Sequence, residues 1–182
     1  MPNAVVVEGR TYRIRTDFRA GIEYQRETIS GNATVGSLFS IFYRDEIPDN
    51  VEDGLEAINR FYRRKDEPVP ESKNGKSGPI PYDFLADADA ICAAFQREYS
   101  IDLTTAKMHW WRFMALLEGL YTYSFSDRVG YRTADLTGLT GKRRAEIIKK
   151  RNLFALDQGQ SMEDHIAQLD EIIARHGGGD NR

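Results

Sequence analysis

The sequence predicts a mainly α-helical protein: a helical bundle with a small β-hairpin at its N-terminus. Apolar residues recur at steps of three and four in most segments beyond residue 17, which is the helical period. Alternating β-branched residues at 4–7 and 11–15 predict two short strands. Of the 182 residues, 41% are hydrophobic and 29% charged, which is the balance of a folded domain rather than of a disordered or fibrous chain.

Composition limits the classes of function. A net charge of −3 and an isoelectric point near 5.7 provide no overall attraction to nucleic acid or anionic lipid. The only cysteine, Cys92, has no partner for an internal disulfide. No stretch approaches the roughly 20 apolar residues of a membrane span, and the N-terminus lacks the basic region of a signal peptide. We therefore expect a cytoplasmic protein that does not cross a membrane.

The N-terminal third is expected to hold the hairpin and three helices. An isolated hairpin is marginal in water, so it must lie on other elements. Asp17 suits the N-cap of the first helix, and Asp49 or Asn50 suits that of the third. The second helix ends at Ile47-Pro48. The apolar faces are expected to carry Phe18, Ile22, Gln25 and Ile29; then Val35, Leu38, Phe39, Phe42 and Tyr43; then Val51, Leu55, Ile58, Phe61 and Tyr62.

The segment at about 66–81 is rich in Asp, Glu, Ser, Lys, Asn and Gly, and four of the six prolines lie in it. This composition predicts an exposed, mobile loop. Such a loop is either a recognition segment that orders on binding or a tolerated surface insertion, and we favour the insertion.

The strongest helical pattern in the chain runs from Leu103 to Leu120 and predicts a buried central helix, because its apolar residues cover most sides. A helix at 87–99 is expected before it, and a short helix or turn at 124–132 after it. Residues of the central apolar surface are Leu103, Ala106, Met108, Trp110, Trp111, Phe113, Met114, Leu116, Leu117 and Leu120.

Two further helices are predicted near the end of the chain. Thr140-Gly141 begins one that runs from Lys142 to about Leu156. After a break at Gly159, Ser161 begins a last helix. We therefore expect a single helical domain with its hairpin at 1–157, followed at 158–182 by a C-terminal helix and a frayed tail.

No arrangement of residues is typical of an active site. The three histidines, His109, His165 and His176, belong to no zinc motif. Asp83, Asp87 and Asp89 fail the calcium-loop spacing, and helix capping with first-turn charge explains them better. We expect no enzyme activity, no cofactor and no metal site.

Two surfaces are candidates for binding other proteins. The helix at 142–151 is strongly basic and is either a solvated face or a grip for phosphates or an acidic segment; the acidic charge of the whole chain argues against nucleic acid as its partner. The last helix either packs on its own domain or serves as a docking or oligomerisation element. The candidate partner-binding residues are Met162, Ile166, Leu169, Ile173, Lys149 and Arg151.

The central residues resemble a known family. The matching segments are 89–95, 99–103, His109-Trp110-Trp111-Arg112-Phe113 and 116–120, with support from 12–19, Tyr131-Arg132, Asp135-Leu136 and Phe154-Ala155-Leu156. Over about residues 10–157 the chain resembles the bacteriophage gene-product-fifteen family of tailed phages and prophages of Gram-positive bacteria. The segment after Gln158 lies outside the resemblance.

The resemblance implies a phage tail-morphogenesis protein of the tail-assembly chaperone type, without enzyme activity or cofactor. It implies the tape-measure protein as partner, the tail tube as a further one, homo-oligomers, and work in the cytoplasm of the bacterial host. Alternative interpretations are a structural virion or tail component, and a nucleic-acid-binding regulator that uses the basic helix 142–151.

Overall fold

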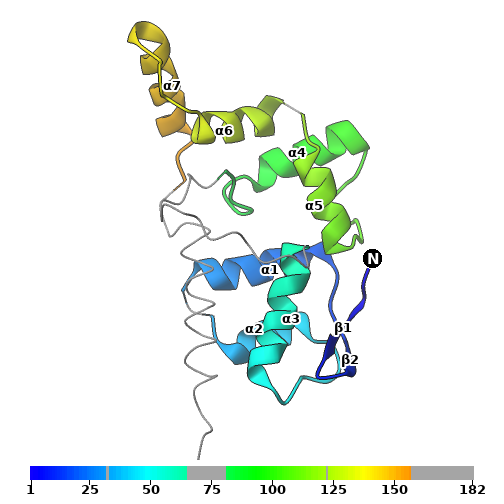
Figure 1. Cartoon of the computed structure of the whole chain (residues 1–182). Coiled ribbons are helices and arrows are strands. Elements are labelled where there is room, and N and C mark those ends of the chain that lie inside the picture. The colour runs from blue at the N-terminus through cyan, green and yellow to red at the C-terminus, as the bar shows by residue number, and fades with distance from the viewer. Residues whose placement is uncertain (32, 65–80, 122, 157–182) are drawn as a thin grey trace, which may run out of the picture. The chain divides into compact units, whose positions relative to one another are not determined.

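The computed structural model describes residues 1–31, 33–64, 81–121 and 123–156 (Figure 1). The predicted loop at 66–81, except for its last residue, and the predicted segment 158–182 lie outside the described residues. The described chain is mainly helical with one two-stranded sheet at its N-terminus, so the predicted fold class is confirmed.

The described residues fall into two compact units. The first contains 1–64 and 107–114, and the second contains 81–106 and 115–156, apart from the undescribed positions 32 and 122. Elements of the first unit are β1 (Ala4–Val7), β2 (Arg10–Arg13), α1 (Phe18–Ile29), α2 (Val35–Phe42) and α3 (Val51–Arg63). Those of the second are α4 (Ala88–Tyr99), α6 (Tyr123–Thr133) and α7 (Gly141–Leu153), and the division falls within α5 (Trp110–Glu118).

The hairpin turns tightly and is held to the helices of its unit. Glu8 and Gly9 both have positive φ, 49° and 78°, as a two-residue hairpin loop of type I′ requires. The second strand therefore begins at Arg10, one residue earlier than expected. Ile14, just after β2, forms an isolated antiparallel bridge with Tyr43 at the end of α2. This pairing supplies the support that a lone hairpin lacks.

Side-chain caps fix the starts of the first three helices. The Asp17 carboxylate accepts the Arg19 backbone N–H at 3.0 Å at the start of α1. Thr34 and Ser37 form a capping box at the start of α2. For α3 the cap is Asn50 rather than Asp49, since its side-chain oxygen accepts the Asp53 backbone N–H at 3.2 Å.

The buried face of α1 differs from the predicted one. Phe18 is buried as expected, but the other buried residues are Gly21, Tyr24 and Thr28. Ile22, Gln25 and Ile29 are only half-buried. Relative to the prediction, α1 is rotated about its axis so that Gly21 and Tyr24 face the core. The Trp110 indole ring packs directly against Gly21, and the Tyr24 ring stacks on Tyr62 with centroids 4.1 Å apart.

The predicted helix from Leu103 to Leu120 is too long, because only Trp110–Glu118 is helical. Asp102 forms a turn instead: its carboxylate accepts the Thr104 backbone N–H at 2.9 Å, and this local bond competes with helix formation. The Trp110 backbone N–H donates to the Thr16 carbonyl at 2.6 Å, and the Phe18 backbone N–H donates to the Met108 carbonyl at 2.9 Å. These bonds form an isolated bridge between Asp17 and His109, so His109 is not part of the helix. The predicted burial of Trp110 and Phe113 is confirmed, at 1% exposure each.

The second unit packs α4 with α6, and α6 with α7. The Tyr99 hydroxyl at the end of α4 donates to the Leu116 carbonyl in α5 at 3.0 Å. The apolar side chains buried in this unit are Ala90, Ile91, Ala94, Phe95, Leu103, Leu117, Leu120 and Phe125. None belongs to α7, which lies outside this core.

We predict that Gly21→Ala destabilises the protein. The new Cβ would lie 2.1 Å from Cε3 of the Trp110 ring, which is buried in the core and cannot simply turn out into solvent. Overpacking of this kind costs about 1–3 kcal/mol. Urea unfolding followed by tryptophan fluorescence measures the change.

Gly130→Ala is the matched control, since a Cβ at this exposed position in α6 meets nothing within 4 Å. Its higher helix propensity should stabilise α6 by about 0.5–1 kcal/mol. Equal effects of the two substitutions would contradict the close packing of Trp110 on Gly21.

Candidate functional site

The candidate site is helix α7 with the loop that precedes it. α7 buries none of its side chains among the described residues. Of its 13 residues, six are basic and one, Glu146, is acidic. Thr140 stands at the N-cap but makes no side-chain capping bond, and the first helical residue, Gly141, has a φ of 55°. The helix therefore presents a dense positive charge to solvent.

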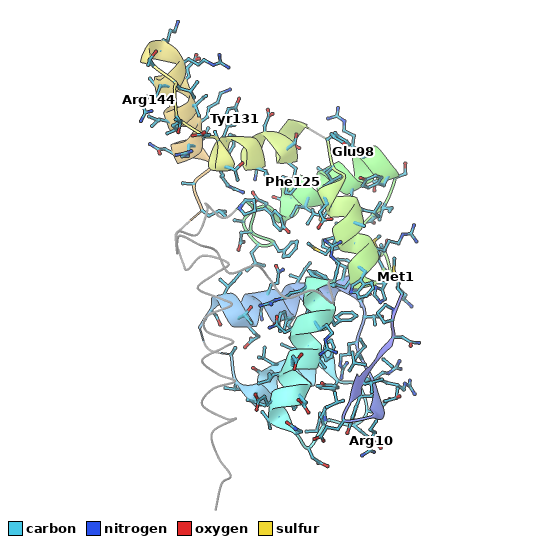
Figure 2. The ribbon with its side chains drawn as sticks, in the orientation of Figure 1. Met1, Arg10, Glu98, Phe125, Tyr131 and Arg144 are labelled. Carbon is cyan, nitrogen blue, oxygen red and sulfur yellow. The ribbon has the colours of Figure 1, made fainter. Side chains whose placement is uncertain are left out.

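Three of the six cations are already bonded within the second unit. Arg144 donates to the Leu136 carbonyl at 3.0 Å, and Arg151 donates to the Ala134 carbonyl. The Lys150 ammonium donates to the Tyr131 hydroxyl at 2.5 Å and lies 4.4 Å from the centre of its ring. Arg144 on α7 and Tyr131 on α6 are labelled in Figure 2. These bonds attach α7 to α6 and to the connecting loop.

The other three cations, Lys142, Arg143 and Lys149, are exposed. They form no ion pair with any residue that the structure describes. Lys142 and Arg143 also lie in the first turn, where the helix dipole disfavours positive charge by about 0.3–1 kcal/mol per residue. An anionic group near this turn would form ion pairs with these exposed cations. It would also offset the unfavourable interaction of Lys142 and Arg143 with the helix dipole. The arrangement therefore favours an acidic partner.

A shallow cavity of about 360 Å³ lies between the loop and α7. Asp135 on its rim accepts the Thr137 backbone N–H at 2.8 Å. A hydrogen bond from the Thr137 side chain, this backbone bond and the nearby Arg151 charge together lower the pKa of Asp135, so the carboxylate stays ionised. Two arginines and one carboxylate line the cavity, and both arginines already donate to the loop, so we assign it no ligand. The lining residues are Ala134, Asp135, Leu136, Thr137, Arg144 and Arg151.

A buried ion pair holds the end of α7 in place. The Asp87 carboxylate, fully buried, accepts two bonds from the Arg132 guanidinium, one of 2.9 Å, and one from Arg128 at 3.2 Å. Arg132 also donates to the Phe154 carbonyl, directly after α7, and to the Pro81 carbonyl at 3.2 Å. One guanidinium therefore joins α4, α6 and the chain on either side of them.

The capping role predicted for Asp87 is wrong. Its side chain makes no capping bond to α4, because it is used in the pair with Arg132. Asp83 does act as a local acceptor, taking the backbone N–H groups of Leu85 and Ala86 at 2.8 and 2.7 Å. Local spacing cannot reveal a partner that lies 45 residues away, so sequence reasoning missed Arg132.

The ionisation of Asp87 is linked to stability. Burial by itself raises the pKa of this carboxyl, but bonds and attraction from Arg132, the Asp83 backbone N–H and Arg128 outweigh burial and lower the pKa. A lowered folded pKa stabilises the protein above the unfolded value of about 3.9. That contribution is lost as the pH falls below this value and through the folded pKa.

The structure describes two of the six predicted partner-binding residues. Lys149 is exposed on α7, whereas Arg151 is half-buried and bonded to the loop. Met162, Ile166, Leu169 and Ile173 lie outside the described residues. Within the described residues, no group of three or more His, Cys, Asp or Glu side chains is placed to hold a metal ion.

Comparison with known proteins identifies the family. The sequence model described as "Bacteriophage Gp15 protein" matches residues 1–156. The chain belongs to this family. The match confirms the resemblance stated from the sequence and ends, like it, close to the end of α7. No curated protein and no solved structure matches this Gp15-family chain. Across its described residues, no helix is long and apolar enough to cross a membrane.

We predict that Asp87→Ala lowers the free energy of unfolding by about 3–5 kcal/mol, because it leaves the buried Arg132 charge without its counter-ion. The double substitution Asp87→Ala with Arg132→Met removes both charges and should recover part of the loss. Urea unfolding at pH 7 measures both. A single variant as stable as the parent would contradict the structural role of the pair.

We also predict a weaker acid dependence in Asp87→Asn. The parent protein should lose stability steeply as the pH falls below about 4, where the lowered pKa of Asp87 makes its protonation costly. The amide variant starts less stable but lacks this titration, so its melting temperature should fall less as the solution is acidified through this range. Parallel curves for the two proteins would count against the linkage.

Proposed function

We propose that this Gp15-family chain is a non-enzymatic tail-assembly protein, a chaperone that coats the tape-measure protein while the phage tail is built. The observation that carries the proposal is an exposed basic helix, α7, in a member of a bacteriophage protein family. An exposed helix that contributes nothing to its own core is suited to contact another helix.

The physical role is protection of apolar surface. A tape-measure protein is a very long helical chain with exposed apolar stripes, and such stripes aggregate unless another surface covers them. Several copies of a small helical protein would cover these stripes until tail-tube subunits replace the small protein. In this chain the residues Met162, Ile166, Leu169 and Ile173 would supply apolar contacts. Lys149 on α7 would supply a positive charge that forms no ion pair among the described residues.

The proposal has consequences for the state of the protein. The proposed chaperone works in the cytoplasm of the bacterial host. Covering apolar surface requires neither a cofactor nor a metal. Coating a long partner requires many copies, so weak and reversible self-association is expected. The tail tube is a further partner, because its subunits must displace the chaperone.

One observation favours a different function. Lys142, Arg143 and Lys149 form no ion pair among the described residues, and such cations bind phosphates. A nucleic-acid-binding regulator would use the helix 142–151 in this way. The net charge of −3 opposes it, because long-range repulsion would weaken every encounter with nucleic acid.

We predict that co-expression with the long tail protein encoded beside it yields a soluble complex with several copies of this chain per partner. Affinity pull-down and light scattering measure composition and mass. Ile166→Asp with Leu169→Asp, on the predicted stripe, should abolish the complex. Ala167→Asp with Gln168→Asp, placed away from the centre of the stripe, should keep it.

Other outcomes separate the alternatives. If the co-expressed partner still aggregates and this chain is found in purified phage particles, the chaperone hypothesis is wrong. The protein is then a structural component of the virion. Binding to DNA with a steep salt dependence, a slope of about −0.9 per phosphate contacted, would favour the regulator.

A further inference from the structure

The His109 ring lies at the start of α5 and contacts two backbone groups. Its Nδ1 is 3.1 Å from the Trp111 backbone nitrogen, and its Nε2 is 2.8 Å from the Pro2 carbonyl oxygen. A backbone N–H can only donate a hydrogen bond, and a carbonyl can only accept one. The two partners therefore require a neutral ring that carries its proton on Nε2, so that Nδ1 accepts and Nε2 donates.

The bond at Nδ1 caps α5. His109 directly precedes Trp110, the first residue of the helix, and accepts the backbone N–H of the second residue. That N–H is one of the four that a helix leaves without an internal acceptor. Asp17 and Asn50 supply the corresponding acceptor with an oxygen atom in α1 and α3. Unlike those oxygens, Nδ1 stops accepting at mildly acidic pH, because a protonated imidazole has donors only.

The bond at Nε2 holds the N-terminal segment, residues 1–3. Pro2 donates no backbone hydrogen bond of its own, and its carbonyl is held by His109, 107 residues further along the chain. The next carbonyl, that of Asn3, accepts the Ile14 backbone N–H at 3.1 Å. All four residues belong to the first unit. One imidazole ring thus joins the N-terminal segment to the start of α5.

Only one orientation of the ring satisfies both partners. The ring packs against Phe61 and Trp111, with centroids 5.8 and 6.0 Å away. A ring turned over by half a turn would present carbon atoms to the Trp111 N–H and to the Pro2 carbonyl. His109 is half-buried, so protons from the solvent reach it without unfolding of the unit.

A positively charged ring would find no counter-ion among the described residues around it. Asp17, on the segment bridged to His109, caps α1 and pairs with Arg19 at 3.2 Å. Glu56, on the same helix as Phe61, pairs with Arg60 at 2.7 Å. The other charged groups on the segments packed against the ring are positive: the Met1 amino group, Arg15, Arg63, Arg64, Lys107 and Arg112.

We propose that His109 is a proton-sensitive latch of the first unit. At neutral pH the ring caps α5 and holds Pro2. A proton on Nδ1 sets an N–H against the Trp111 N–H, so the ring leaves its place, and the N-terminal segment and the start of α5 are released together. Histidine changes its charge between about pH 5 and 8, so the latch opens under mild acid. It concerns the first unit alone and does not depend on the proposed chaperone function.

Amide hydrogen exchange of the full-length protein at pH 7.5 and 5.5, corrected for the intrinsic rate at each pH, tests the latch. An opened ring titrates like a free histidine, whose pKa is about 6.5, so acidification over this range should raise the opened population about tenfold. The Trp111 and Ile14 amides should both lose protection by this factor. Unchanged protection at Trp111 would overturn the latch, and a loss at Trp111 alone would overturn the joint release of the N-terminal segment.

The variant His109→Asn separates the latch from other titrations. The asparagine side-chain oxygen can accept the Trp111 N–H, as in other helix caps, and it takes up no proton in this range. Protection of Trp111 should then change about twofold or less between the two pH values. The matched control is His165→Gln with His176→Gln, which removes the other two histidines and should keep the tenfold change. Equal pH dependence in His109→Asn and in the control would overturn the proposal. Circular dichroism checks that the variants are folded at both pH values.

Discussion

The buried pair of Asp87 and Arg132 is the interaction on which the second unit depends. A guanidinium taken out of water is stable only when its donors find acceptors, and here they find a carboxylate and the carbonyls of Pro81 and Phe154. The start of α4, the end of α6 and the residue after α7 must therefore come together for any of them to be stable. The pair fixes the position of α7 at its C-terminal end, and bonds from Arg144, Lys150 and Arg151 attach the helix to the loop and to α6.

In the first unit the corresponding constraint is apolar. Trp110 packs on Gly21, and Trp111 next to it donates its indole N–H to the Phe61 carbonyl at 2.9 Å. Two consecutive tryptophans thus contact α1 and α3 in different ways: the first packs closely on α1, and the second forms a part-buried hydrogen bond to α3. The pair makes core contacts, as expected of aromatic residues at helical spacing.

The division of the α7 cations connects this architecture with function. Cations bonded to the loop and to Tyr131 determine how α7 is attached, and they are not available to a partner without loss of that attachment. Lys142 and Lys149 lie on another side of the helix, where their side chains are exposed. The cations that attach α7 and the exposed cations Lys142 and Lys149 therefore lie on different sides of one helix.

The sequence by itself determined the elements and much of the core. The helical period located α1, α2, α3, α4 and α7, the cap at Asp17 was visible as a residue type, and the burial of Trp110 and Phe113 followed from their apolar surroundings. These features depend on interactions between residues close in sequence or on hydrophobicity alone. The basic composition of α7 was equally visible.

Only the tertiary structure decided the rest. The start of α5 at Trp110 depends on the backbone bridge between Asp17 and His109, and the buried face of α1 depends on an indole ring far along the chain. The pairing of Asp87 with Arg132, and the distinction between bonded and available cations on α7, depend on which groups folding brings within hydrogen-bond distance. Hydrophobic periodicity in the sequence specifies which side of a helix or strand is apolar. It does not specify which distant polar group contacts that element, because tertiary packing determines those contacts.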